Sequence, residues 1–118
     1  MLLQLLLLFT YTLFPVTTTE EPDHSGTYTY DVKHTPYGDF AGRIVVEKEK
    51  KGYKVAIIND KGENFNAVVT RQKSNRIVLN TNFEHMDAVL YGYFKGDKLI
   101  ARIEGKGDPF LYKLIAWK

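Results

Sequence analysis

The side chains that could perform chemistry in this chain are few and lie far apart in the sequence. Its histidines are His24, His34 and His85. None of them has another histidine or a pair of carboxylates at the spacing that zinc sites use. We therefore expect that the protein holds no metal ion and no cofactor.

The carboxylates and serines also lack the arrangement of a catalytic site. General acid–base catalysis by carboxylates needs two of them that converge in a cleft with separated pKa values. Four acidic residues that lie within or beside the predicted strands fall on the predicted outer face or in turns: Asp31, Asp39, Asp87 and Glu104. Ser25 and Ser74 lie in a linker and a hairpin tip, without the strand–turn–helix context of a nucleophile elbow. We therefore expect that the protein is not an enzyme.

Aromatic residues, 14% of the chain, are the more informative set. Many occur at alternate positions of β-like runs and are predicted to point inward. The candidate ligand-binding residues among them are Tyr28, Tyr30, Phe40, Tyr53, Phe83 and Tyr112. Two interpretations stay open. The rings fill the interior as core, or they leave room for one small apolar ligand that tyrosine hydroxyls orient at the mouth.

A second set of apolar side chains alternates to the opposite, outer face. Val89, Tyr91 and Tyr93 belong to this set and follow one another on one side of a single run. A contiguous patch there would indicate contact with a partner protein or a second copy of the chain. Scattered exposure of single apolar residues is the alternative and is normal for a monomer.

The elements that position these residues are runs in which apolar and polar side chains alternate, which is typical of half-buried β-strands. Glycine, proline and charged residues interrupt the runs at regular intervals and predict tight turns. The eight predicted strands cover residues 27–33, 39–48, 53–57, 64–71, 76–83, 86–94, 98–104 and 110–117.

Eight sequential strands joined by short turns predict an all-β fold, an antiparallel up-and-down barrel that closes and so removes its exposed edges. A two-sheet sandwich is the alternative, but it usually needs a longer crossing connection than any seen here. Gly42 lies inside the second run, where a glycine would let the strand bend and a facing side chain approach.

The chain has 118 residues, 44% of them hydrophobic, which is enough for one domain with a proper core. Its net charge is +2, and the charged residues are interspersed. A nucleic-acid surface would need a basic stripe, so we expect no nucleic-acid partner. The chain has no cysteine, which excludes both disulfides and lipid attachment through a lipobox.

The first 19 residues carry no charged side chain, and residues 2–9 are almost pure leucine. This run is typical of a secretory signal peptide, and an uncleaved N-terminal anchor is the alternative. We expect residues 20–25 to form a polar spacer and residues 26–118 the barrel. The protein is then exported, periplasmic or extracellular, and contacts a membrane only through this N-terminal run if the run is not cleaved.

Three segments suggest a family. The opening Gly26-Thr27-Tyr28, residues 38–44 (GDFAGRI) and residues 93–99 (YFKGDKL) resemble small lipocalin-like, calycin-type barrel domains of bacterial secreted and cell-envelope proteins. Two positions depart from that pattern: Tyr28 stands where the family often has tryptophan, and Ala101 where it often has glycine.

The resemblance implies a non-catalytic, exported barrel that binds a small apolar ligand or serves as an accessory protein of the cell envelope. The alternative function is a protein-interaction module, of the kind found in inhibitors, that recognises a partner through its loops and outer face.

Overall fold

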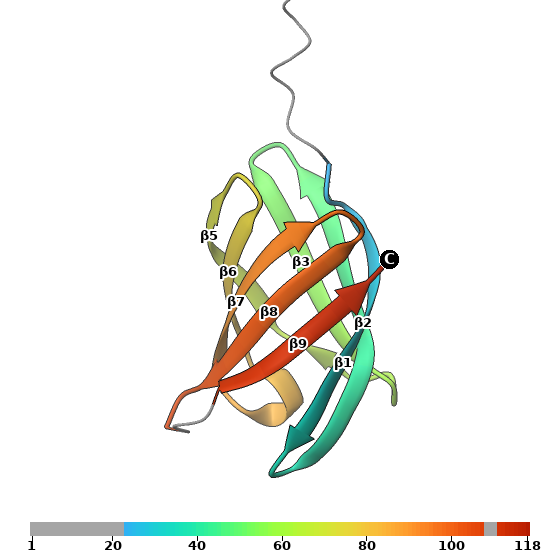
Figure 1. Ribbon diagram of the computed structural model, residues 1–118. Helices are drawn as coiled ribbons and strands as arrows, with labels where there is room; N and C mark the ends of the chain where they lie inside the picture. Colours follow the sequence, from blue (N-terminus) through green and yellow to red (C-terminus); the bar gives the residue numbers. More distant parts are fainter. Residues whose placement is uncertain (1–22, 108–110) are drawn as a thin grey trace, which may run out of the picture.

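The computed structural model describes residues 23–107 and 111–118, and these residues form an antiparallel, nearly closed β-barrel. The only helix in this part of the chain is a single 3-10 turn, η1 (Phe83–His85). Figure 1 shows the strands wrapped around one interior. The strands are β1 (Gly26–Thr35), β2 (Gly38–Glu49), β3 (Gly52–Asn59), β4 (Asn64–Phe65), β5 (Ala67–Lys73), β6 (Arg76–Thr81), β7 (Ala88–Lys95), β8 (Lys98–Gly105) and β9 (Leu111–Trp117).

Except for β4 and β5, neighbours in the sequence are neighbours in the sheet, and the first and last strands pair with each other. The strand order is β4-β3-β2-β1-β9-β8-β7-β6-β5. Asp31 of β1 lies opposite Ile115 of β9, and this pairing joins the two halves of the sheet. The two strands at the ends of that order, β4 and β5, are consecutive in the chain, so one seam runs down the barrel beside them.

The prediction of eight strands is wrong, because the run predicted at residues 64–71 divides into two strands. β4 pairs with β3, whereas β5 pairs with β6. The backbone N–H of Asn66, between them, donates to the side-chain oxygen Oδ1 of Asn82 at 2.7 Å. The chain changes its sheet partner at this residue, and the described residues therefore contain nine strands.

The predicted alternation between the inner and outer faces holds along the barrel wall. The buried core consists of side chains from every strand except β5 together with Phe83 of η1, and it extends from Tyr28 to Ala116. Gly42 supports the close packing at one point, because a Cβ atom there would lie 2.9 Å from the Tyr30 ring. The interior is therefore occupied by packed side chains along its length.

The two ends of the barrel differ in what covers them (Figure 1). One end is formed by the β2–β3, β5–β6 and β7–β8 turns together with residues 23–25 and Lys118, and we call it the upper end. The lower end is formed by η1, the β1–β2 turn and the β3–β4 loop. Among the described residues, every buried core residue lies between Tyr28 and Ala116, so residues 20–118 include this core.

The predicted signal peptide and residues 20–22 of the predicted spacer lie outside the described residues, so both stay predictions. Within residues 23–107 and 111–118, no helix is long and apolar enough to cross a membrane.

Candidate functional site

The structure places five of the six candidate residues in two groups at opposite ends of the barrel. Tyr28 and Tyr53 lie at the upper end and contact Phe94. Tyr30, Phe40 and Phe83 pack together at the lower end. Tyr112 lies in β9 opposite Ile103 of β8 and is buried. The candidates therefore do not converge on one central cavity.

At the upper end the chain itself occupies the tyrosine hydroxyls that were expected to orient a ligand. The backbone N–H of His24 donates to the Tyr53 hydroxyl at 3.0 Å, and the Tyr28 hydroxyl donates to the His24 carbonyl at 2.7 Å. The His24 ring stacks on Phe94, with ring centroids 4.4 Å apart. A pocket of about 460 Å³ remains beside this contact, and three charged residues, Asp23, Asp97 and Lys118, lie among those that line it.

At the lower end, Phe83 is the centre of an aromatic cluster. Its ring centroid lies 5.7 Å from Tyr30, 5.8 Å from Phe40 and 5.9 Å from Phe65, all in edge-to-face contacts. Such contacts add stability beyond that of buried area alone. The cluster forms a firm apolar floor at this end of the interior.

A pocket of about 450 Å³ lies at this end, and we call it the lower pocket. Its lining residues come from the β1–β2 turn, from β2 and from the segment around η1: Tyr37, Phe40, Glu84, His85 and Met86. Apolar walls with a small number of polar groups are the usual anatomy of sites for small ligands, and the volume lies in their range of about 300–1,000 Å³. The lower pocket is therefore our candidate functional site.

A strained turn aims the polar side chains at the lower pocket. Glu84 and His85 have φ angles of 48° and 65°, in the left-handed region that non-glycine residues rarely adopt. Backbone hydrogen bonds from His85 to Asn82 (2.8 Å) and from Met86 to Phe83 (2.9 Å) hold this turn. Strained backbone conformations of this kind persist only where the surrounding structure maintains them, and they are frequent at binding and switch sites.

A contact between the side chains of His85 and Glu63 and a hydrogen-bonded loop hold η1 in place. His85 Nε2 lies 3.2 Å from Glu63 Oε2, and Glu63 accepts a second hydrogen bond, from the Asn59 side chain at 2.8 Å. These hydrogen bonds hold the pKa of the Glu63 carboxyl below its ordinary value, with the bond from Asn59 as the larger cause. The contact joins the β3–β4 loop to the segment that carries Glu84 and Met86.

Glu84 is the charged group best placed to recognise a ligand in the lower pocket. The side chain is half-buried, and the loss of solvation on burial raises the pKa of its carboxyl. A hydrogen bond from Asn59 acts in the opposite direction and lowers this pKa, but its effect is smaller. A carboxylate that has lost part of its water shell gains from a ligand group that donates hydrogen bonds or carries positive charge. The pocket thus combines apolar walls with one acceptor group.

Tyr30 carries an orphan polar group close to this end. Its hydroxyl is buried and has no hydrogen-bond partner among the described residues, which is rare for a buried polar atom. Burial raises the pKa of Tyr30, and the nearby charges of Glu84 and Asp60 raise it further. Because both carboxylates belong to the lower end, the hydroxyl points toward that end.

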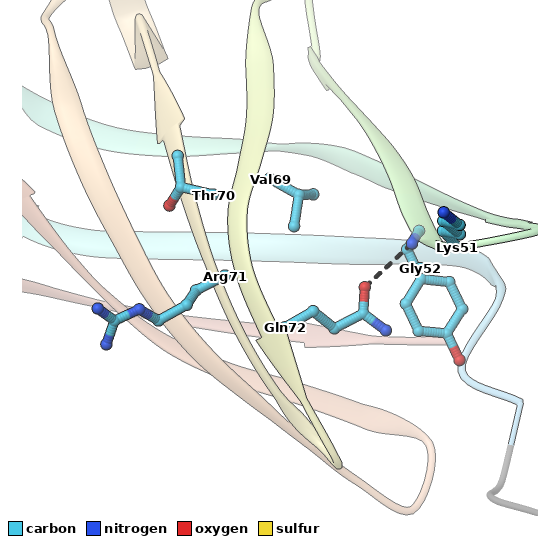
Figure 2. Close-up of a pocket in the computed structure, with 7 residues that line it drawn as sticks. Lys51, Gly52, Val69, Thr70, Arg71 and Gln72 are labelled. Atoms are coloured by element: carbon cyan, nitrogen blue, oxygen red, sulfur yellow. Dashed lines mark hydrogen bonds between the residues drawn. The ribbon is translucent and has the colours of Figure 1, made fainter.

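The seam between β3 and β5 forms a third pocket, of about 380 Å³ (Figure 2). No strand pairing joins the upper halves of β3 and β5. Instead, the side chain of Gln72 spans the seam, and its Oε1 atom accepts a hydrogen bond from the Tyr53 backbone N–H at 3.0 Å. Lys51, Thr70 and Arg71 make this pocket polar, so it lacks the apolar walls of the lower pocket.

The sequence analysis did not single out Tyr37, Glu84 or Met86, and it considered His85 only as a possible metal ligand. The one signal in the sequence is Phe83-Glu84-His85-Met86, in which two polar residues stand between two apolar ones within a loop. In the described part of the chain, no group of three or more histidines and carboxylates could hold a metal ion.

No protein-family model matches this chain, and no curated protein matches it in sequence. The barrel agrees with a calycin-type fold at the coarse level of an antiparallel β-barrel.

Proposed function

We propose that the protein is a non-catalytic, exported, lipocalin-like barrel that binds a small amphipathic ligand in the lower pocket. One observation carries the proposal: a pocket of ligand size in which the apolar side chains of Phe40 and Met86 face the same space as the half-buried carboxylate of Glu84. The ligand has an apolar body and a polar end that donates hydrogen bonds.

The packing of the barrel supports the lower pocket over the other places where a ligand could bind. The central interior is occupied by core side chains. The hydroxyls of Tyr28 and Tyr53 at the upper end already bond to the backbone of His24. The seam pocket is lined by Lys51, Arg71 and other polar groups. The lower pocket joins an aromatic floor centred on Phe83 to the partly desolvated carboxylate of Glu84.

Two fluorescent probes that differ by one charged group test the proposal. N-phenyl-1-naphthylamine is neutral and has an N–H donor, whereas 8-anilino-1-naphthalenesulfonate has the same ring system and adds a sulfonate. With residues 20–118, we expect the neutral probe to bind and the anionic probe to bind at least about tenfold more weakly, because its sulfonate meets Glu84 and Glu63.

Substitutions in the pocket give the matched controls. Met86→Glu adds a carboxylate to the apolar wall and should abolish binding of the neutral probe. Val68→Glu adds the same charge at an exposed position of β5, away from the pocket, and should leave binding unchanged. Glu84→Gln should reduce the discrimination against the anionic probe. Absence of binding of the neutral probe, or equal loss in Met86→Glu and Val68→Glu, would refute the proposal.

Export is tested separately, because it depends on the uncharged N-terminal run. Residues 1–25 fused to a reporter should carry it out of the cytoplasm, and the N-terminus of the mature protein should begin near residues 17–20. A reporter that stays soluble in the cytosol contradicts export, and an intact N-terminus in the membrane fraction indicates an anchor.

A further inference from the structure

The outer wall of β7, β8 and β9 carries a continuous row of apolar side chains. Tyr93 of β7 lies directly opposite Ile100 of β8, and Ile100 lies opposite Ile115 of β9. Residues directly opposite in an antiparallel pair point to the same face, with Cβ atoms about 4.5–5.5 Å apart. Tyr91 and Trp117 lie on the same face, one alternation away along β7 and β9. We call these five residues the outer row.

Basic side chains surround the outer row. Arg102 lies opposite Tyr91, and its guanidinium is 5.2 Å from the centre of the tyrosine ring. The remaining basic neighbours in register are Arg76 opposite Tyr93, Lys98 opposite Trp117, and Lys113 opposite Arg102. Two carboxylates adjoin these residues: Asp31 lies opposite Ile115, and Glu104 accepts a hydrogen bond from the Tyr91 hydroxyl at 3.4 Å. The wall is therefore apolar at its centre and mainly basic around it.

A hollow of about 280 Å³ adjoins this wall where β9 meets β1. Ile115 and Trp117 supply its apolar surface, Lys33 and Lys113 supply positive charge, and Asp31 and His34 complete its lining. Two ammonium groups against one carboxylate leave the hollow with a positive charge, which suits one anionic group on an apolar body. Two ammonium groups would face the anion while the carbon skeleton lies against Ile115 and Trp117.

We propose that this wall docks on an anionic phospholipid surface, with the hollow between Lys33 and Lys113 as a seat for one phosphate headgroup. Tyrosine and tryptophan flanked by lysine and arginine, around aliphatic side chains, are the residue set that favours a membrane–water interface. Basic residues add attraction to anionic lipid. This contact goes beyond the sequence prediction, which placed membrane contact only in the N-terminal run.

Two other occupants fit the wall less well. A second copy of the chain would place basic residues against the same basic residues, which costs binding energy. Single-stranded nucleic acid stacks its bases on aromatic rings, but aliphatic Ile100 and Ile115 occupy the middle of the outer row. An anionic lipid surface can interact with both parts of the wall, because its acyl chains contact the aliphatic centre and its headgroups attract the basic residues around it.

The single tryptophan makes the docking directly measurable, since Trp117 belongs to the outer row and is 39% exposed. Residues 20–118 are titrated at low ionic strength with vesicles of equimolar phosphatidylglycerol and phosphatidylcholine. We expect the Trp117 emission to shift to shorter wavelength, and the shift to disappear with phosphatidylcholine alone or at high salt. The assay uses purified protein, so it does not depend on export or on ligand binding in the lower pocket.

A pair of charge-reversal variants separates the wall from general charge. Lys98→Glu with Lys113→Glu should weaken vesicle binding by at least about tenfold, because each basic residue near an anionic surface contributes about fivefold. Lys54→Glu with Lys61→Glu makes the same change in net charge at exposed positions of β3 and the β3–β4 loop, and should have a much smaller effect. Equal effects of the two pairs, or no shift of Trp117 emission with anionic vesicles, would overturn the proposal. A shift produced by polyglutamate or an oligothymidylate but not by vesicles would likewise overturn it, in favour of an acidic protein or a nucleic acid.

Discussion

The ring of His24 stacks on the ring of Phe94, with a centroid separation of 4.4 Å and an angle of 5° between the planes. His24 precedes the first strand, and Phe94 lies near the end of β7, so the start of the described chain covers the upper end of the interior. The tyrosine hydroxyls on either side of the stack hold the same segment through its backbone. Because the chain itself occupies this end of the interior, we propose the lower pocket as the ligand site.

The upper closure predicts a measurable cost for removing one hydroxyl. Tyr28→Phe keeps the buried ring and deletes the donor to the His24 carbonyl, so the free energy of unfolding should fall by about 1 kcal/mol. Tyr37→Phe is the matched control, because Tyr37 is 64% exposed, and its effect should stay below about 0.5 kcal/mol. Urea denaturation of residues 20–118 measures both. Equal effects of the two substitutions would show that the hydroxyl does not hold the closure.

Burial of two tyrosines predicts a loss of stability in alkali. Desolvation raises the pKa of Tyr28 from 10.0 to about 12, with smaller contributions from neighbouring groups, and burial raises the pKa of Tyr30 as well. Because the folded state favours the neutral phenols, their contribution to stability is complete below pH 10 and decreases as pH rises from 10 toward 12. The denaturation midpoint should therefore fall over this window, and less steeply in Tyr28→Phe. A midpoint that stays constant across the window contradicts the burial of these hydroxyls.

Much of the wall of the barrel could be predicted from the sequence, because successive side chains of any β-strand point to opposite faces of the sheet. Tyr28 and Tyr30 are buried and Tyr93 is exposed, as the alternation predicts. The division of the run at residues 64–71 could not be predicted in the same way. It depends on a hydrogen bond between Asn66 and Asn82, residues far apart in the sequence, and alternation carries no signal for such a contact.

The candidate site was predictable only in part. The aromatic floor followed from the inward positions of Phe40 and Phe83, which the structure brings into contact. The assignment of Tyr28 and Tyr53 to a ligand mouth did not anticipate His24, because a polar segment before the first strand gives no indication of where it packs. Glu84 was not singled out because its role depends on the left-handed turn, and no glycine marks that turn.

The core and the outer row should respond differently to truncation of one aromatic side chain. Phe83 is 2% exposed and contacts three other aromatic rings, so Phe83→Ala should lower the free energy of unfolding by about 3–5 kcal/mol. Tyr93 is 39% exposed, so Tyr93→Ala should change it by less than about 0.5 kcal/mol. Chemical denaturation followed by circular dichroism compares them. Similar costs would mean that the assignment of inner and outer faces is wrong.

The bridge across the seam predicts a local change in hydrogen exchange. Gln72→Ala removes the acceptor for the Tyr53 N–H, so the Tyr53 amide should exchange faster while amides in the middle of β8 keep their protection. Stability should fall by about 1 kcal/mol. Lys73→Ala, at the exposed neighbouring position, is the control and should change neither quantity. Unchanged exchange at Tyr53 in Gln72→Ala would show that the seam is held by other contacts.

The position of a bound ligand tests the central claim most directly. Amide ¹H–¹⁵N spectra of residues 20–118 are recorded during titration with N-phenyl-1-naphthylamine. Binding in the lower pocket predicts that the shifted resonances belong to Tyr37, Phe40 and residues 84–86, and that those of Asn75 and Asp97 at the upper end stay in place. Shifts centred on the upper end or on Gln72 at the seam, or no shifts at all, would contradict it.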